Sequence, residues 1–491
     1  MKNKYIKEII LVGVLLLVTA GFGFKDLTEK PRVWFDDGLT MQLAKNVALS
    51  GQYGVEIAPH QFTSYPYYIT VSYPVILPAA LVIKIVGPII WAPRFVAALF
   101  IVGLVLSFYF VARYLYGRWM AFASTTLLVS FPPLYGNGRA FLGEVPGLAY
   151  LFFCIFLWQA GRNFSRRVYA CLFFALSGLS AGMALASKPS FLLVIPGFAI
   201  FLFLEYLKRE EGSARRLFFW GFGFASSVIA WVLISIPRPY SFKIFKEIFN
   251  YYSNSYADAD ILGNVSANVL KLFTDGSAIL FLVLLVGAVV VFCHEIFSKK
   301  VFTIAWPLYI FAFLTFLWWL KTPGWYRYFF PAEIVLFMFF PTALRLIVQS
   351  IFGKRFFGYF VYGLAIVSLA AFQFWWFIFK SYVPTGSATL IVEILNNKFN
   401  SAAEIFVLNS PEFSFGIRNH NFSQYFYYNP THALGENALL RPAQNLPPIV
   451  VYNLKSATVV LPQVQEALDR YYKTYIFEGS NVIKVLNNYD K

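Results

Sequence analysis

Eleven stretches of this chain are apolar and close to the length of about 20 residues that a helix needs to cross a lipid bilayer. A segment inside a bilayer has no water to bond its backbone, so each stretch is expected to be a helix. The chain is therefore predicted to be a polytopic α-helical membrane protein. The expected spans are residues 8–24, 92–112, 119–136, 145–160, 168–186, 190–207, 216–236, 277–297, 301–320, 328–348 and 356–379.

The charge content excludes a water-soluble globule. Charged residues make up 13% of the 491 residues and hydrophobic residues 59%, whereas about 25% charged residues is typical of soluble domains. The net charge of +16 lies mainly in short links between apolar stretches. That distribution is typical of membrane topology, so no nucleic-acid partner is expected.

Residues 73–88 decide the topology. Pro74, Pro78, Lys84 and Pro88 leave only about ten uninterrupted apolar residues, which favours an interfacial helix over a span. The basic links then all fall on one side, as expected for the cytoplasmic face of an inner (plasma) membrane. The N-terminus would be cytoplasmic and the C-terminus extracytoplasmic. These link residues are Arg113, Arg118, Arg162, Arg166, Arg167, Lys208, Arg209, Arg215, Arg216, Lys299, Lys300, Lys354 and Arg355.

Three large pieces would face the outside: loop 25–91, loop 237–276 and the tail 381–491. The tail is more polar than the transmembrane part, residues 1–380. It contains short β-like runs and one helical stretch, which together predict a small extracytoplasmic α/β domain. The β-like runs are 404–408, 449–452, 474–477 and 482–485, and the helical stretch is 461–471.

An acidic pair opens the first outer loop. Asp36 and Asp37 precede a stretch in which Leu39, Leu43 and Val47 recur every four residues. This spacing predicts an amphipathic helix on the membrane, ending at Ser50-Gly51. The carboxylates could cap the helix or carry chemistry.

Further polar residues lie in the other short outer turns. Arg139 and Glu144 sit at the mouth of two helices and could form a structural ion pair. Lys188 could be a lysine that extends its ammonium group to water. Tyr326 and Arg327 could belong to an aromatic belt, with Glu333 following within the apolar stretch.

The gathering of these groups on one membrane face is more informative than any single one. Carboxylates can act as general bases, and cations can stabilise a departing phosphate. Together they suit a reaction that deprotonates a hydroxyl and expels a phosphate.

The same motifs resemble those of the GT-C glycosyltransferases, especially the bacterial relatives of protein O-mannosyltransferases and of the lipid A aminoarabinose transferase. The resemblance covers residues 1–350. It is carried by Asp36-Asp37-Gly38, Ser50-Gly51-x-Tyr53-Gly54, Ser72-Tyr73-Pro74, Gly87-Pro88, Trp91, Arg94, Arg139 to Glu144-x-Pro146, Lys188-Pro189 and Tyr326-Arg327-Tyr328-x-x-Pro331.

The resemblance implies an inverting enzyme that moves a monosaccharide, a hexose or a pentose, from a polyprenyl-phosphate carrier. The acceptor would be a lipid, polysaccharide or protein on the outer face of the membrane. Residues 1–380 would form the catalytic domain. Asp36 would be the general base. Asp37 remains the alternative, because the family's motif is often Asp-Glu whereas this chain has two aspartates at these positions. Glu144 would orient the acceptor or a bound ion.

The resemblance also implies where the carrier binds. Lys188 and Arg327 would hold its phosphate, with Arg139 nearby. Tyr326 would line the groove for the lipid, and Glu333 belongs to the same predicted site. A divalent metal ion is left open, because the four histidines (His60, His294, His420 and His432) are scattered along the chain.

Two other classes of function remain in view. A transporter or lipid-linked glycan flippase would be expected to place ionisable residues near the middle of the membrane, often in repeated halves. A polysaccharide polymerase or ligase would join preassembled chains. The size of the transferred unit distinguishes that activity from single-sugar transfer.

Overall fold

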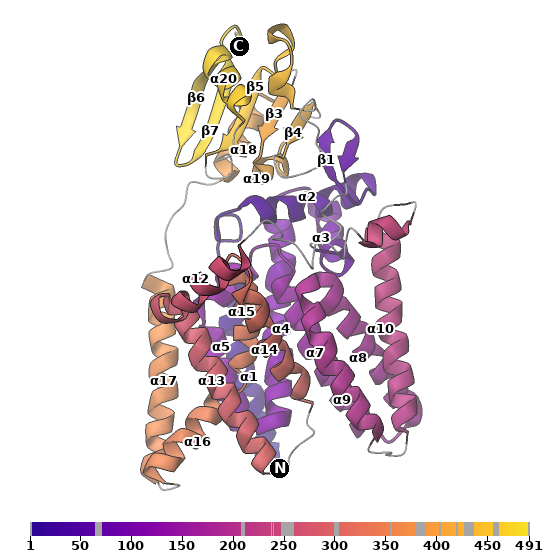
Figure 1. Cartoon of the computed structure of the whole chain (residues 1–491), viewed down its shortest axis with the longest axis vertical. Coiled ribbons are helices and arrows are strands. Elements are labelled where there is room, and N and C mark those ends of the chain that lie inside the picture. Colours follow the sequence, from indigo (N-terminus) through magenta and orange to yellow (C-terminus); the bar gives the residue numbers. More distant parts are fainter. Residues whose placement is uncertain are drawn as a thin grey trace.

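The computed structural model describes residues 2–63, 71–207, 212–236, 238, 240–246, 260–298, 304–353, 356–379, 388–401, 404–418, 421–426, 437–454 and 461–489. A bundle of helices carries a small sheet domain at one end, and the N-terminus lies at the other end (Figure 1).

In their described parts, all eleven expected spans coincide with helices. The helices are α1 (Lys2–Gly23), α4 (Trp91–Tyr116), α5 (Arg118–Ser130) with α6 (Pro132–Gly138), α7 (Glu144–Asn163), α8 (Arg167–Ser187), the 3₁₀ turn η2 (Pro189–Val194) with α9 (Ile195–Leu207), α10 (Ser213–Ser235), α13 (Gly276–Phe297), α14 (Trp306–Leu320), α15 (Tyr326–Leu336) with α16 (Phe340–Phe352), and α17 (Phe356–Phe379).

The prediction of a multi-pass helical membrane protein is confirmed, and the number of long spans is smaller than eleven. Within the described residues, eight helices are long and apolar enough to cross a membrane, or nine if α15 and α16, bent by 58°, form one span. The expected span 119–136 is interrupted at Phe131, which precedes Pro132 and adopts an extended conformation, as residues before proline tend to do. Helix α14 has only 15 residues.

The ambiguous segment forms α3 (Tyr73–Val86), a helix of 14 residues with Pro78 inside it. At 1.5 Å per residue it is about 21 Å long, shorter than the roughly 30 Å hydrocarbon core. The links α4–α5 and α7–α8 lie at the end of the bundle away from the sheet, as do the last residues of α9 and the first residues of α10 (Figure 1). Six of the basic link residues lie outside the described residues: Lys208, Arg209, Lys299, Lys300, Lys354 and Arg355.

The predicted amphipathic helix is α2 (Phe35–Ser50), and it ends where expected, at Gly51 with a φ of 69°. Its surroundings differ from the expectation. Helix α2 lies between the bundle and the sheet domain, where it contacts α3 on one side and α19 (Pro411–Ser414) on another (Figure 1). Residues from Asp37 to Asn46 are all buried, so protein covers its polar face as well as its apolar one.

The small C-terminal α/β domain is confirmed. Its five strands follow the order β4-β3-β5-β7-β6, with β3 parallel to β4 and β5, and with β7 antiparallel to β5 and β6. The bounds are β3 (Ile405–Leu408), β4 (Phe422–Tyr425), β5 (Ile449–Asn453), β6 (Tyr472–Glu478) and β7 (Asn481–Leu486), with helices α18 (Ala388–Lys398) and α20 (Pro462–Tyr471).

Two smaller features complete the outer pieces. The first loop contains a hairpin of β1 (Val55–Ala58) and β2 (Gln61–Thr63), and β1 contacts β4. The expected loop 237–276 contains α12 (Ile261–Thr274) in its described part.

Candidate functional site

An ion pair joins the first outer loop to the last short outer turn. Asp36, the second residue of α2, accepts a hydrogen bond from Arg327, the second residue of α15, although 291 positions separate them in the chain. Three aromatic rings surround the Arg327 guanidinium, with centroids 5.2 Å (Trp34), 4.8 Å (Trp325) and 5.2 Å (Tyr328) from its carbon. Cation–π attraction therefore helps to hold this cation at the mouth of the bundle.

A second ion pair lies at the start of α7. Glu144 accepts a hydrogen bond from Lys188, which lies between α8 and η2. Gly143 permits this approach, because a Cβ there would collide with the Ser187 carbonyl oxygen. The second oxygen of Glu144, Oε2, is buried and has no hydrogen-bond partner within the described part of the chain.

The two ion pairs form one electrostatic unit. Burial lowers the pKa of Lys188, Glu144 raises it, Arg327 lowers it further and Asp36 raises it. The side chain of Asp36 is 36% exposed, and those of Lys188 and Arg327 are each 19% exposed. The unit thus presents one accessible carboxylate and two accessible cations.

Asp37 occupies a different environment from its neighbour. Its side chain is fully buried, with Oδ2 2.5 Å from Arg94 Nη2 and Oδ1 accepting from the backbone N–H of Phe141 at 2.7 Å. Arg94 also donates to the Leu27 carbonyl oxygen at 3.0 Å. Burial raises the pKa of Asp37, while Arg94 lowers it. Neither carboxylate caps α2, since Trp34 is the N-cap residue and makes no side-chain cap bond.

The other predicted site residues are engaged elsewhere. Arg139 donates to the carbonyl oxygens of Lys25 at 2.7 Å and Tyr135 at 3.1 Å, so it holds the chain just after α1. Tyr326 donates to Glu333 at 2.7 Å within α15. Glu333 is fully buried. The structure therefore brings Asp36, Arg327, Glu144 and Lys188 together and gives the remaining residues separate contacts.

The sheet domain packs directly on the helix that carries Asp36. At Gly38, a Cβ would lie 2.5 Å from the Glu412 backbone nitrogen and 2.6 Å from its Cα, so only glycine permits this approach. Further along α2, Gln42 donates to the Pro411 carbonyl oxygen at 3.1 Å and Lys45 to the Ser414 carbonyl oxygen at 3.2 Å.

The loop before α2 holds the sheet domain as well. Arg32 donates to Ser480 Oγ at 2.7 Å and to Asn481 Oδ1 at 3.0 Å, both at the turn before or the start of β7. The position of the predicted catalytic helix thus depends on residues more than 300 positions later in the chain.

Glu412 is a buried carboxyl group at this junction. Burial raises its pKa to about 7, although Arg32 opposes the shift and Asp37 adds to it. The folded protein therefore holds the Glu412 proton more tightly than the unfolded chain does between pH 4.5 and 7. Stability from this group is fully present below pH 4.5 and is lost as the pH rises through about 7.

The Glu412→Gln variant is accordingly expected to be more stable than the native protein at pH 8, by roughly 2–3 kcal/mol, and to differ little at pH 4.5. Thermal unfolding at both pH values checks this. Glu393→Gln, at an exposed position on α18, serves as the control. Equal effects of the two substitutions at pH 8 would contradict the expectation.

Metal ligands do not gather in the described residues, where no three His, Cys, Asp or Glu side chains lie close enough to hold an ion. Asp36 and Glu144 are the carboxylates nearest to the expected chemistry, and each is paired with a cation.

Three residues that contribute to the candidate site or its support were not predicted from the sequence. Arg94 was quoted only as part of a motif, although a lone charge in the first turn of an apolar stretch is itself a signal of a buried partner. Trp34 directly precedes the α2 helix and supplies a ring for Arg327. Glu412 carries no local signal, because only the fold brings it to α2.

Comparison with known proteins relates this architecture to membrane enzymes. Residues 75–235 match the family described as dolichyl-phosphate-mannose-protein mannosyltransferase. No curated protein matches the chain in a sequence search.

The solved structures that are similar over nearly the whole chain include the following three. ArnT from Cupriavidus metallidurans in the apo state has 14% identity and a TM-score of 0.59, covering 98% of both chains. ArnT bound to undecaprenyl phosphate has 13% identity and a TM-score of 0.57, covering 97% of both. The oligosaccharyltransferase AglB from Archaeoglobus fulgidus, in complex with an inhibitory peptide and a dolichol-phosphate, has 11% identity and a TM-score of 0.59, covering 99% of this chain and 75% of the other. Likeness at these identities establishes a shared fold.

Proposed function

Because this chain has the fold of the GT-C glycosyltransferases, we propose that it transfers a monosaccharide from a polyprenyl-phosphate carrier to an acceptor hydroxyl, with inversion. The acceptor is a lipid, a polysaccharide or a protein. The reaction takes place on the extracytoplasmic face of the plasma membrane, with the N-terminus in the cytoplasm.

The observation that carries the proposal is the pairing of Asp36 with Arg327 beside the pairing of Glu144 with Lys188. All four residues lie at the same end of the bundle, at the beginning or just beyond the end of their helices. A flippase would be expected to use ionisable groups near the middle of the membrane, whereas these groups lie at the ends of helices.

The chemistry follows from which groups are accessible. Asp36 accepts the proton of the acceptor hydroxyl while the hydroxyl oxygen forms a bond to the anomeric carbon of the sugar. The bond from that carbon to the phosphate oxygen breaks, and the polyprenyl phosphate leaves with the electron pair. Lys188 and Arg327 stabilise the negative charge of the leaving phosphate.

The ion pair between Asp36 and Arg327 suggests that binding of the donor activates the base. In this proposal the carrier phosphate binds Arg327, the partner of the Asp36 carboxylate. A bound phosphate competes for the guanidinium and frees Asp36 to accept a proton. Glu144 raises the pKa of the partly buried Lys188 and so helps to keep its ammonium group charged in the absence of carrier.

Two proteins of this fold support the choice of carrier, since ArnT was solved with undecaprenyl phosphate and AglB with a dolichol-phosphate. The test compares envelope glycans from cells with and without the active protein. Loss of a single sugar is the expected result. Loss of a whole preassembled chain would favour a polymerase or ligase, and unchanged glycans would contradict the proposal.

Replacing Lys188 by glutamine is expected to raise the donor KM about 10- to 100-fold, because a charge-assisted bond to phosphate is lost. Initial rates against donor concentration in proteoliposomes measure this. Lys188→Arg should recover part of the affinity, and the exposed Lys398→Gln should behave as the native protein. An unchanged donor KM in Lys188→Gln would count against the phosphate assignment.

A further inference from the structure

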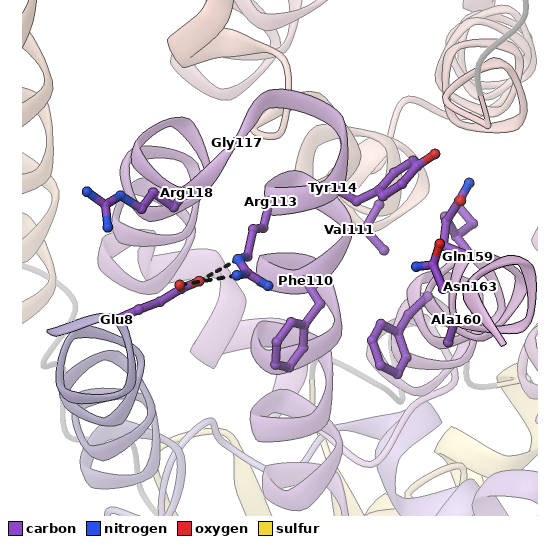
Figure 2. Close-up of a pocket in the computed structure, with 12 residues that line it drawn as sticks. Glu8, Phe110, Val111, Arg113, Tyr114, Gly117, Arg118, Gln159, Ala160 and Asn163 are labelled. Carbon is purple, nitrogen blue, oxygen red and sulfur yellow. Dashed lines mark hydrogen bonds and ion pairs between the residues drawn. The ribbon is translucent and has the colours of Figure 1, made fainter. Parts of the chain in front are cut away.

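A pocket of about 580 Å³ lies at the end of the bundle away from the sheet domain, where α1, α4 and α7 meet. Arg113 of α4 is paired there with Glu8 of α1, with Nε 2.5 Å from Oε1 and Nη2 3.2 Å from Oε2 (Figure 2). Arg118 and Gln159 project on opposite sides of α4 (Figure 2). The pocket therefore joins α1 to α4 through an ion pair, and its polar groups do not converge on one point.

Polar residues do converge at the other end of the bundle, on one face of α12. Asn264, Asn268 and Lys271 follow one another at intervals of four and three residues, which places them on the same side of the helix. Helix α12 lies at the end of the bundle that carries the sheet domain (Figure 1). This polar face meets the turn of residues 321–325, which joins α14 to α15.

Every backbone carbonyl from residue 319 to residue 324 accepts a hydrogen bond from this face of α12. The last four carbonyls of a helix have no partner within it, so the end of α14 needs such donors. The bonds run from Asn268 to the carbonyl oxygens of Trp319 (3.2 Å), Leu320 (3.0 Å) and Thr322 (2.8 Å), from Asn264 to that of Lys321 (3.4 Å), and from Lys271 to those of Pro323 and Gly324 (3.3 Å each).

Asn268 is the centre of this contact. Its side chain is only 1% exposed, and it makes the three shortest of the bonds. Gly324 lies against it with a φ of 72°, and a Cβ there would collide with the Asn268 amide oxygen. Only glycine therefore permits both this backbone conformation and this approach.

The turn leads directly into Arg327. Trp325 is the N-cap residue of α15, and Arg327 is the second residue of that helix. The Trp325 ring lies 4.8 Å from the Arg327 guanidinium carbon and stacks on the Tyr328 ring at 5.5 Å. The turn thus sets both the start of α15 and one of the rings that hold the guanidinium.

We propose that Asn268 is a positioning residue that sets Arg327 for the carrier phosphate. The inference rests on the proposed function, which assigns Arg327 to that phosphate. Asn268 acts through the carbonyls of residues 319–324 and does not touch the substrate. Groups that bind a ligand must be held to within about 0.5 Å of their productive position. Loss of the Asn268 amide lets the turn relax and moves the guanidinium away from the phosphate.

The test measures equilibrium binding of two probes, undecaprenyl phosphate and undecaprenol, to the full-length protein in detergent. The probes share the polyprenyl chain and differ in the phosphate. Asn268→Leu removes the amide and nearly keeps the size of the side chain. It is expected to bind undecaprenyl phosphate about tenfold more weakly, and to bind undecaprenol as the native protein does. A purely structural defect would weaken binding of both probes.

Lys271→Met tests the same turn from a half-buried position, so the result does not depend on whether Asn268→Leu folds. It removes the two longer bonds to residues 323 and 324 and should weaken binding of undecaprenyl phosphate about threefold. Asn396→Leu is the matched control. It also removes an amide from a backbone carbonyl, that of Gly416 at 2.9 Å in the sheet domain, and should bind both probes as the native protein does.

Arg327→Gln shows whether Asn268 acts through Arg327. This variant should bind undecaprenyl phosphate about 10- to 100-fold more weakly, and adding Asn268→Leu to it should cause no further loss. Additive losses would overturn the inference, as would an equal loss for undecaprenol. Native affinity for undecaprenyl phosphate in Asn268→Leu, or in Lys271→Met if Asn268→Leu does not fold, would also overturn it. Native affinity in Arg327→Gln alone would instead refute the phosphate assignment within the proposed function.

Discussion

Sugar transfer is expected to fall by about 10²–10⁴-fold in Asp36→Asn, the usual effect of removing a positioned general base. The substitution keeps the size of the side chain and leaves its partner, Arg327, within its three aromatic rings. The variant should therefore insert and fold normally. Transfer assays in proteoliposomes and thermal unfolding in detergent measure the two properties separately.

Asp37→Asn is the matched control, because it makes the same chemical change one residue away. Asp37 and Arg94 are both fully buried, so the substitution leaves a buried guanidinium without its counter-ion. Such losses typically cost about 3–5 kcal/mol of stability. Asp37→Asn should thus lower the unfolding temperature, whereas Asp36→Asn should not. Native rates of transfer in Asp36→Asn would refute its assignment as the base.

The different environments of Asp36 and Asp37 could not be predicted from the sequence. The motif places both carboxylates in the first turn of a helix, and the structure agrees with that local prediction. Successive helical residues point about 100° apart, so one can face a substrate while the other faces the core. Which one does so depends on Arg94 in α4. The lone charge of Arg94 signals a buried partner, but it does not indicate which of the two aspartates that partner is.

The spans were predictable because hydropathy is a local property that a bilayer imposes on each segment. The four charged residues that gather at one end of the bundle were all predicted from the sequence, because each lies where a predicted helix begins or ends. Arg139 satisfied the same pattern, yet it bonds the backbone after α1. Its role is set by a neighbouring helix end, which hydropathy does not reveal.

The sheet domain was predictable in class and less so in detail. Strands β3, β5, β6 and β7 and helix α20 coincide with the expected runs to within a few residues. Strand β4 was missed because its sequence, Phe-Ser-Gln-Tyr, is buried at all four positions and shows no alternation. Its Gln424 is buried because it bonds Gln42 of α2, so this strand is explained by the docking of the domain.

Gly38→Ala tests whether that docking supports the proposed catalysis. The added Cβ would lie 2.5–2.7 Å from backbone atoms of Pro411 and Glu412, and backbone cannot move aside as a side chain can. Either α19 or α2 must shift. Overpacking of this kind costs about 1–3 kcal/mol, and a displacement of about 1 Å at a reacting group can lower the rate about 100-fold. We therefore expect a large loss of turnover without any change to a charged side chain.

The measurements are turnover at saturating donor, thermal unfolding, and hydrogen exchange in α2 and α19. Exchange should increase at both helices in Gly38→Ala, because each covers the other in the native protein. Gly136→Ala is the matched control, since Gly136 is also helical and a Cβ there would meet nothing within 4 Å. Gly38→Ala could instead retain native turnover while hydrogen exchange at α19 increased. Docking of the sheet domain would then not contribute to catalysis, and the geometry of Asp36 would be set by Arg94 and Arg327 alone.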